Sequence, residues 1–105
     1  MRDSTKVLEL SCLIQENNKD KFYITKKLIE EMSELSTVLL QCTNKPEEVT
    51  DEQLQNILEE VADVELRLSI YKCVHLTPKE HKVVKKRIDM KLEKYKNKLG
   101  RKDNI

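Results

Sequence analysis

The chain has 105 residues, 37% of them charged and 38% hydrophobic, with one glycine, two prolines and a net charge of +1. This length fits one domain over residues 1–105, and the scarcity of turn residues favours an all-α fold over a sheet. Because no apolar run approaches about 18 residues and the N-terminus has no apolar signal core, we expect a cytoplasmic protein without membrane partners.

The first two predicted helices lie in the N-terminal half. The first covers about residues 4–17 and stops at the turn-prone sequence NNKD. The second begins after Asp20, a helix-capping residue, and continues until the sequence TNKPEE interrupts it. Its apolar positions keep the helical period: Leu28, Met32, Leu35, Leu39 and Cys42.

Two capping boxes begin the remaining helices. The third helix opens with Thr50-Asp-Glu-Gln53 and fades near Cys73. The fourth opens with Thr77-Pro-Lys-Glu80, which places proline at the first helical position, and is expected to end near Gly100. The sequence therefore predicts four helices in one bundle.

The three cysteines do not form a recognisable framework. Cys12, Cys42 and Cys73 lie far apart, are odd in number and include no CxxC pair. This spacing argues against a disulfide framework or a zinc site, and it predicts three buried, reduced thiols.

Two segments 29 positions apart repeat one pattern, LIEEMSEL from residue 28 and ILEEVADV from residue 57. On a wheel of about 100° per residue, Glu31 and Glu34 fall near 300° and 240° from Leu28, and Glu60 and Asp63 fall at the same angles from Ile57. One ExxE spacing usually marks ordinary surface acids, but its repetition at the same angle indicates two halves of one site.

Antiparallel packing of the two repeat helices would bring the four acids together. Such like charges cannot all stay ionised in a partly buried site unless a cation is present. Oxygen ligands favour Mg²⁺, with Mn²⁺ as the nearest substitute. Di-iron bundles use Glu-x-x-His, a spacing that neither His75 nor His81 provides.

At these positions the chain resembles the MazG-like all-α nucleoside triphosphate pyrophosphohydrolases, whose superfamily includes dimeric dUTPases. The similarity covers about residues 24–99 and rests on the EExxE…ExxD pattern, in KKLIEEMSEL and EEVADVEL, and on the basic KLEKYKNKL of short, phage-type members. It departs from many members at Ile24, where they have Gln, and at Arg67, where they have Asn.

This resemblance implies Mg²⁺ held by the four motif acids, with cleavage between the α and β phosphates to a monophosphate and pyrophosphate. The ligands would be Glu31, Glu34, Glu60 and Asp63. Glu30 and Glu59 remain open as a general base, orienting groups or plain surface, and surface is the simplest interpretation. Specificity for the nucleoside is expected around Phe22, Tyr23 and the first helix.

Basic residues gather near the C-terminus. Residues 79–105 hold 11 Lys or Arg and 4 acids, whereas residues 1–78 hold 9 and 15. Candidate phosphate-binding residues are Lys27, one turn before Glu31, and a stripe of Lys91, Lys94, Lys98 and Arg101. A solvated face would look the same, and no groove-reading motif or aromatic interleaving supports nucleic-acid binding.

Helix 2 carries aliphatic residues across roughly 200° of its wheel, which is wider than one packed face of a small bundle requires. Burying this excess against a second copy predicts a homodimer or a higher homo-oligomer. The competing interpretation is a non-catalytic helical interaction module in which the acids pair with the basic helix of a neighbour and no metal binds.

Overall fold

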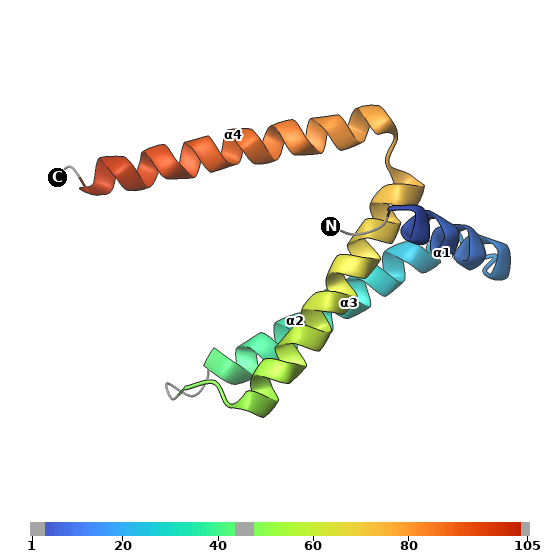
Figure 1. Cartoon of the computed structure of the whole chain (residues 1–105), viewed down its shortest axis with the longest axis horizontal. Helices are drawn as coiled ribbons and strands as arrows, with labels where there is room; N and C mark the ends of the chain where they lie inside the picture. The colour runs from blue at the N-terminus through green and yellow to red at the C-terminus, as the bar shows by residue number, and fades with distance from the viewer. Residues whose placement is uncertain (1–3, 44–47, 104–105) are drawn as a thin grey trace. The chain divides into compact units, whose positions relative to one another are not determined.

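The computed structural model describes residues 4–43 and 48–103, and within them it is all-helical (Figure 1). The helices are α1 (Ser4–Asn17), α2 (Tyr23–Thr43), α3 (Asp51–His75) and α4 (Pro78–Asp103). The all-α prediction is confirmed, and the predicted helices match these elements closely. None of the described helices is long and apolar enough to cross a membrane.

The chain divides into two compact units, residues 1–75 and 76–105, and each is described by itself. In the first unit, α3 packs against both α2 and α1. The second unit contains α4, and all its side chains from residue 78 to residue 100 are exposed. A single domain and a four-helix bundle that includes α4 therefore stay predictions.

Both capping boxes form as the sequence predicts. At the start of α3, Gln53 N donates to Thr50 Oγ1 over 3.1 Å, and Thr50 N donates to Gln53 Oε1 over 2.9 Å. Thr77 and Glu80 make the same reciprocal pair before α4, at 2.9 and 3.2 Å. The backbone and side-chain hydrogen bonds of Thr77 hold the pKa of Glu80 below its usual range because they stabilise its carboxylate.

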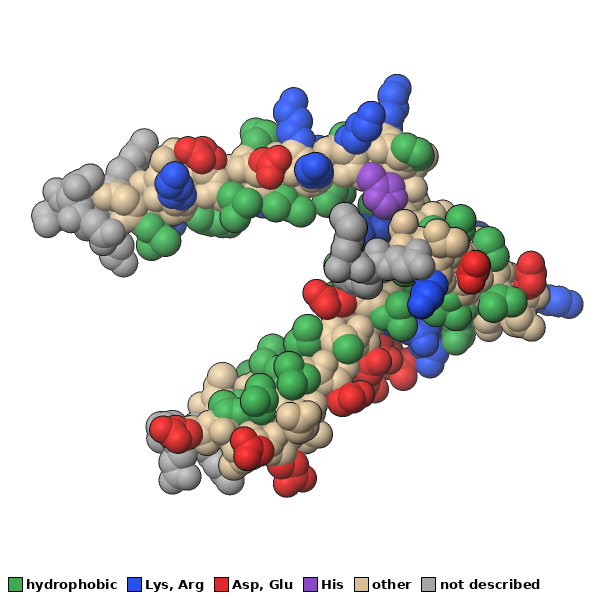
Figure 2. All heavy atoms as spheres, in the orientation of Figure 1, with side chains coloured by type: hydrophobic (Ala, Val, Ile, Leu, Met, Phe, Trp, Pro, Cys, Tyr) green, Lys and Arg blue, Asp and Glu red, His purple; other side chains and the backbone are tan. Residues whose placement is uncertain are grey.

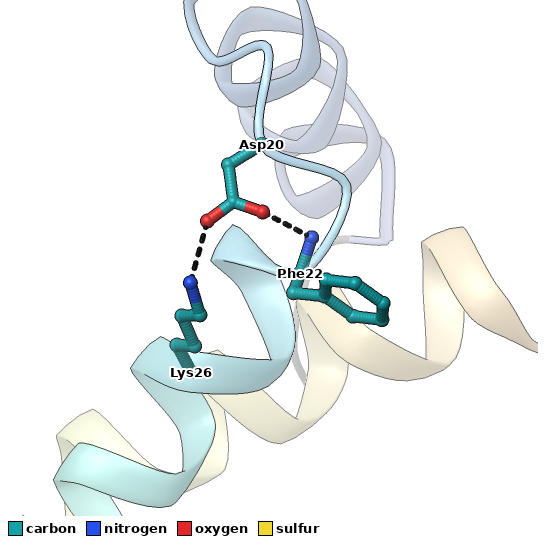
Figure 3. A network of polar contacts seen from close by, with 3 residues as sticks. All are labelled: Asp20, Phe22 and Lys26. Atoms are coloured by element: carbon teal, nitrogen blue, oxygen red, sulfur yellow. Dashed lines mark hydrogen bonds and ion pairs between the residues drawn. The ribbon is translucent and has the colours of Figure 1, made fainter.

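Asp20 caps the start of α2, as predicted (Figure 3). Its Oδ1 accepts the Phe22 N–H at 2.9 Å, its backbone carbonyl accepts the Tyr23 N–H at 3.1 Å, and its Oδ2 binds Lys26 Nζ at 2.9 Å. The bond to Lys26 and the bond to Phe22 lower the pKa of Asp20. These contacts fix the turn that connects α1 to α2.

The predicted end of α4 near Gly100 is wrong, because the helix continues to Asp103. No glycine among the described residues has a positive φ, so Gly100 does not form the left-handed C-terminal stop that ends many helices. The flanking lysines and leucine favour a helix enough to extend it through this position.

The α2–α3 pair has a regular seam. A row of buried and half-buried positions runs along each helix at spacings of four and three residues, the pattern of helices packed at a shallow angle, and Ile70, the most buried residue of α3, lies outside this row. On α2 these positions are Ile24, Leu28, Glu31, Leu35, Val38 and Cys42, and on α3 they are Gln53, Ile57, Glu60, Val64, Arg67, Tyr71 and Val74. Three seam positions are thus charged, in a place where apolar residues normally pack.

The seam is rotated from the predicted apolar stripe of helix 2. Met32 and Leu39 were expected at its centre, but they are 44% and 43% exposed, whereas Glu31 and Val38 lie in the packed row. All three cysteines are free thiols, as predicted. The predicted burial is wrong for Cys12, which is exposed. Cys12 faces outward because α1 buries only Ser11, whose Oγ donates to the Val7 carbonyl.

Candidate metal centre

Three of the four predicted acids converge between α2 and α3. Glu31, Glu60 and Asp63 each present a carboxylate oxygen, and these oxygens all lie within 4.8 Å of one another. Glu31 comes from the first repeat, and the other two residues come from the second. The antiparallel packing of two similar helices therefore assembles the cluster from both halves of the repeat.

Packing in the seam leaves one carboxylate oxygen of each of two cluster residues buried without a hydrogen-bond partner among the described residues. They are Oε2 of Glu31 and Oε2 of Glu60, the carboxylates that occupy seam positions. A buried acceptor without a partner costs free energy, since it has lost its hydration and gained nothing in exchange. A positively charged ligand at this position would remove that cost.

The charge on Glu31 is disfavoured by its surroundings. Burial raises the pKa of its carboxyl, and the negative charges of Glu34 and Asp63, a hydrogen bond with Glu34 and the charge of Glu30 raise it further. All of these effects favour the protonated acid. In the absence of a cation, this side chain therefore binds a proton more readily than an ordinary glutamate does.

Glu34, the fourth predicted ligand, lies beside the cluster. It is exposed one turn after Glu31, close enough to raise that residue's pKa, but it is outside the group of three convergent oxygens. Its role as a ligand stays a prediction. Glu59 is also exposed, while Glu30 forms an ion pair with Lys27 at 3.2 Å, so Glu30 is engaged with a cation.

Two cations lie next to the cluster on the side that leads to the start of α2. Lys27 is half-buried one turn before Glu31, and its Nζ also lies 5.9 Å from the centre of the Tyr23 ring. Arg67 is half-buried one turn after Asp63 in the α3 seam. The four-three spacing from Glu60 places Arg67 on the same face of α3 as the acids, although the sequence pattern marked it only as a departure from the family's Asn.

The predicted phosphate-binding stripe lies on α4. Lys91, Lys94 and Lys98 are exposed along one helix face, and the side chain of Arg101 lies outside the described residues. Figure 2 shows α4 with hydrophobic side chains along one side and basic side chains along another. The approach of this stripe to the acidic cluster stays a prediction.

No known protein family, characterised protein or solved structure matches the chain.

Proposed function

We propose that the protein is a Mg²⁺-dependent nucleoside triphosphate pyrophosphohydrolase that yields a nucleoside monophosphate and pyrophosphate. The observation that supports this most is the convergence of three carboxylates from a repeated motif, two of them with buried oxygens that lack hydrogen-bond partners. The resemblance to MazG-like enzymes in the same residues gives the reaction class.

The donor set fits a hard divalent cation. Its atoms are carboxylate oxygens, which Mg²⁺ and Mn²⁺ prefer, and the two orphaned oxygens would gain the partner that the packed protein does not provide. Glu31, Glu60 and Asp63 would hold the ion, with Glu34 completing the set from one turn away. When bound, such an ion neutralises phosphate charge and activates a water molecule for attack on phosphorus.

The surrounding residues position the anionic substrate. Lys27 precedes Glu31 by one turn of α2, and its ion pair with Glu30 restrains the ammonium on that turn, where it could bind a substrate phosphate. Leu28 is buried and Leu35 half-buried, and these seam residues flank Glu31, so the carboxylate is held on rigid helices rather than on a loop. Rigid placement of charges reduces the reorganisation that a phosphoryl-transfer site would otherwise require.

A second copy of the chain would cover exposed apolar surface of the first unit. Figure 2 shows hydrophobic side chains gathered along the α2–α3 pair. This surface includes Ile29, Met32, Leu39, Leu40, Leu54, Leu58 and Leu68, each more than 40% exposed. Contiguous apolar surface of this kind marks an interaction site, and a two-fold dimer is the commonest way to bury it. Basic residues of α4 from a neighbouring copy would then be available to bind the substrate phosphates.

One observation favours the alternative, a non-catalytic helical interaction module. The exposed apolar residues of α4, among them Val84, Ile88, Tyr95 and Leu99, recur at helical spacing between lysines, as in a helix that docks against a partner. Such a module would bind its partner without metal and would release no pyrophosphate.

Product analysis tests the proposal against the alternative. We would incubate the protein with the common ribo- and deoxyribonucleoside triphosphates in Mg²⁺, in Mn²⁺ and in EDTA, and quantify monophosphate and pyrophosphate. We expect release of pyrophosphate from at least one nucleotide, only with metal, and its loss in Asp63→Asn but not in the exposed control Glu59→Gln. Absence of pyrophosphate from every nucleotide would favour the interaction module.

A further inference from the structure

A cavity of about 290 Å³ lies where α1 meets the start of α2 and the end of α3. Its walls combine apolar and polar side chains: Ile14, Gln15, Asn18, Tyr23, Val74 and His75. The volume is at the lower limit of about 300 Å³ for small-molecule sites, so the cavity suits a ring system rather than a whole nucleoside triphosphate. Lys19, Asp20 and Lys21 add charged groups to the lining, so that six of its ten residues are polar or charged. A lining that offers both apolar surface and hydrogen-bonding groups suits a nucleobase.

The cavity lies on the same side of the helix pair as the acidic cluster. On a wheel of about 100° per residue, Ile24 falls within about 20° of Glu31 on α2, and Val74 falls within about 20° of Asp63 on α3. Ile24, at the cavity, precedes Glu31 by seven residues, or about 10 Å along the helix. This separation places the cavity within reach of a ligand whose phosphates lie at the cluster.

Arg67 stands between the cluster and the cavity. It follows Asp63 by four residues and precedes Val74 by seven, so it lies about 6 Å from the former and about 10 Å from the latter along the axis. Its guanidinium forms no ion pair with any residue in the described ranges, although Asp63 is one turn away. A half-buried arginine without an ionic partner is suited to receive a phosphate in a bidentate manner.

The opposite direction along the seam lacks these features. From the cluster toward the end of α2, the described seam positions are Leu35, Val38 and Cys42, and on α3 they are Ile57 and Gln53. None of these five residues is a cation. Among the described seam positions, the cation, Arg67, therefore lies on the α1 side of the acids, the side on which the 290 Å³ cavity also lies.

We propose that this cavity binds the nucleoside end of the substrate, with Arg67 holding the phosphate nearest the sugar. The amide of Gln15 and the ring of His75 then face the base, and Tyr23 offers an aromatic surface against it. Asp20 shapes the rim without repelling the ligand, because its two carboxylate oxygens are engaged by Phe22 N and Lys26 Nζ (Figure 3). This inference rests on the proposed function for the position of the phosphates.

Two probes separate the ends of the site. Nucleoside monophosphates contain the base and the phosphate nearest the sugar, whereas inorganic pyrophosphate engages only the metal end. We would measure the dissociation constants of both in Mg²⁺ by calorimetry, for the wild-type chain and for variants whose helicity by circular dichroism is unchanged. Gln15→Trp fills the cavity from an exposed position of α1, and Lys19→Trp does the same from its rim.

We expect Gln15→Trp and Lys19→Trp to weaken binding of the monophosphate at least tenfold and to leave pyrophosphate unchanged. Arg67→Met should weaken the monophosphate roughly ten- to hundredfold while the order of base preference is kept, because only a charged hydrogen bond is lost. The matched controls are Gln41→Trp and Arg87→Met, both at exposed positions far from the cavity in sequence, and they should change neither constant.

The outcomes also separate this inference from the proposed function. Equal weakening of both probes, unchanged monophosphate binding in the cavity variants, or no monophosphate binding by the wild-type chain would each overturn the nucleoside site. If the binding pattern is as expected but no triphosphate yields pyrophosphate, the nucleoside site stands and the proposed reaction fails. If turnover is observed and the cavity variants keep the wild-type KM, the reaction stands and the nucleoside site fails.

Discussion

The substitution Glu31→Gln should have opposite effects on the stability of the metal-free protein and on its response to Mg²⁺. At 4.8 Å, the upper limit of separation within the cluster, two unit charges repel by about 1 kcal/mol in bulk water and by about 3.5 kcal/mol at an effective dielectric constant of 20. Because these carboxylates are in partial contact with solvent, the lower figure is the better guide. Glutamine removes two such repulsions.

We therefore expect Glu31→Gln to raise the free energy of unfolding in EDTA by about 1 kcal/mol or more, or about 4–8 °C in melting temperature for each kcal/mol in a unit of this size. In the wild-type chain, Mg²⁺ at 100 times its dissociation constant should stabilise the fold by about 2.7 kcal/mol. The variant should lose most of this stabilisation, because it lacks one charged ligand. Thermal denaturation followed by circular dichroism, with and without Mg²⁺, measures both effects.

The control is Glu59→Gln, which removes the same charge from an exposed position on α3. It should behave like the wild-type chain in both conditions. A lower melting temperature of Glu31→Gln in EDTA would show that Glu31 is not repelled by its acidic neighbours, and an equal gain from Mg²⁺ in the variant and the wild-type chain would show that Glu31 is not a ligand.

The pKa of Glu31 is raised in the folded state, which therefore binds the proton more tightly than the unfolded chain does, so the stability of the metal-free protein should fall as the pH rises above the unfolded value near 4.5. Melting curves in EDTA from pH 4 to 8, compared with those of Glu31→Gln, measure this dependence. An increase in stability with pH that is present in the wild-type chain and absent from Glu31→Gln would contradict it. Asp63→Asn should lower Mg²⁺-dependent turnover at least hundredfold with unchanged helicity, and a steady-state assay that shows full activity would exclude this ligand. Thr50→Ala should cost about 1 kcal/mol by removing the capping box of α3, measured by urea denaturation, with Thr37→Ala on the exposed side of α2 as the control. Sedimentation at micromolar concentration should show a dimer or larger species, and an active monomer would overturn the proposed assembly.

The sequence is sufficient to predict the helices because their boundaries depend on local interactions. The Thr50 and Thr77 capping boxes and the Asp20 cap satisfy backbone groups within a few residues, and all three form as expected. The acidic cluster was also predictable in outline. Repetition of one motif at one angular position requires that antiparallel helices present Glu31 and Glu60 to each other.

Features that depend on which of several possible helix faces packs against a neighbouring helix were not predictable in the same way. The wide apolar arc of α2 offers several possible seams, and only packing against α3 selects the row with Glu31 and Val38 over the row with Met32 and Leu39. The cavity at Tyr23 has contributions from three helices, so no single periodicity shows it, although the first helix and Tyr23 were expected nearby.

The proposed Mg²⁺-dependent pyrophosphohydrolase activity is tested most directly by phosphorus NMR, which identifies the products formed from a nucleoside triphosphate with Mg²⁺ and with EDTA. We expect equal amounts of nucleoside monophosphate and pyrophosphate, formed only when Mg²⁺ is present and only when Glu60 is intact. Formation of a nucleoside diphosphate and inorganic phosphate, or pyrophosphate release that persists undiminished in Glu60→Gln, would contradict this expectation.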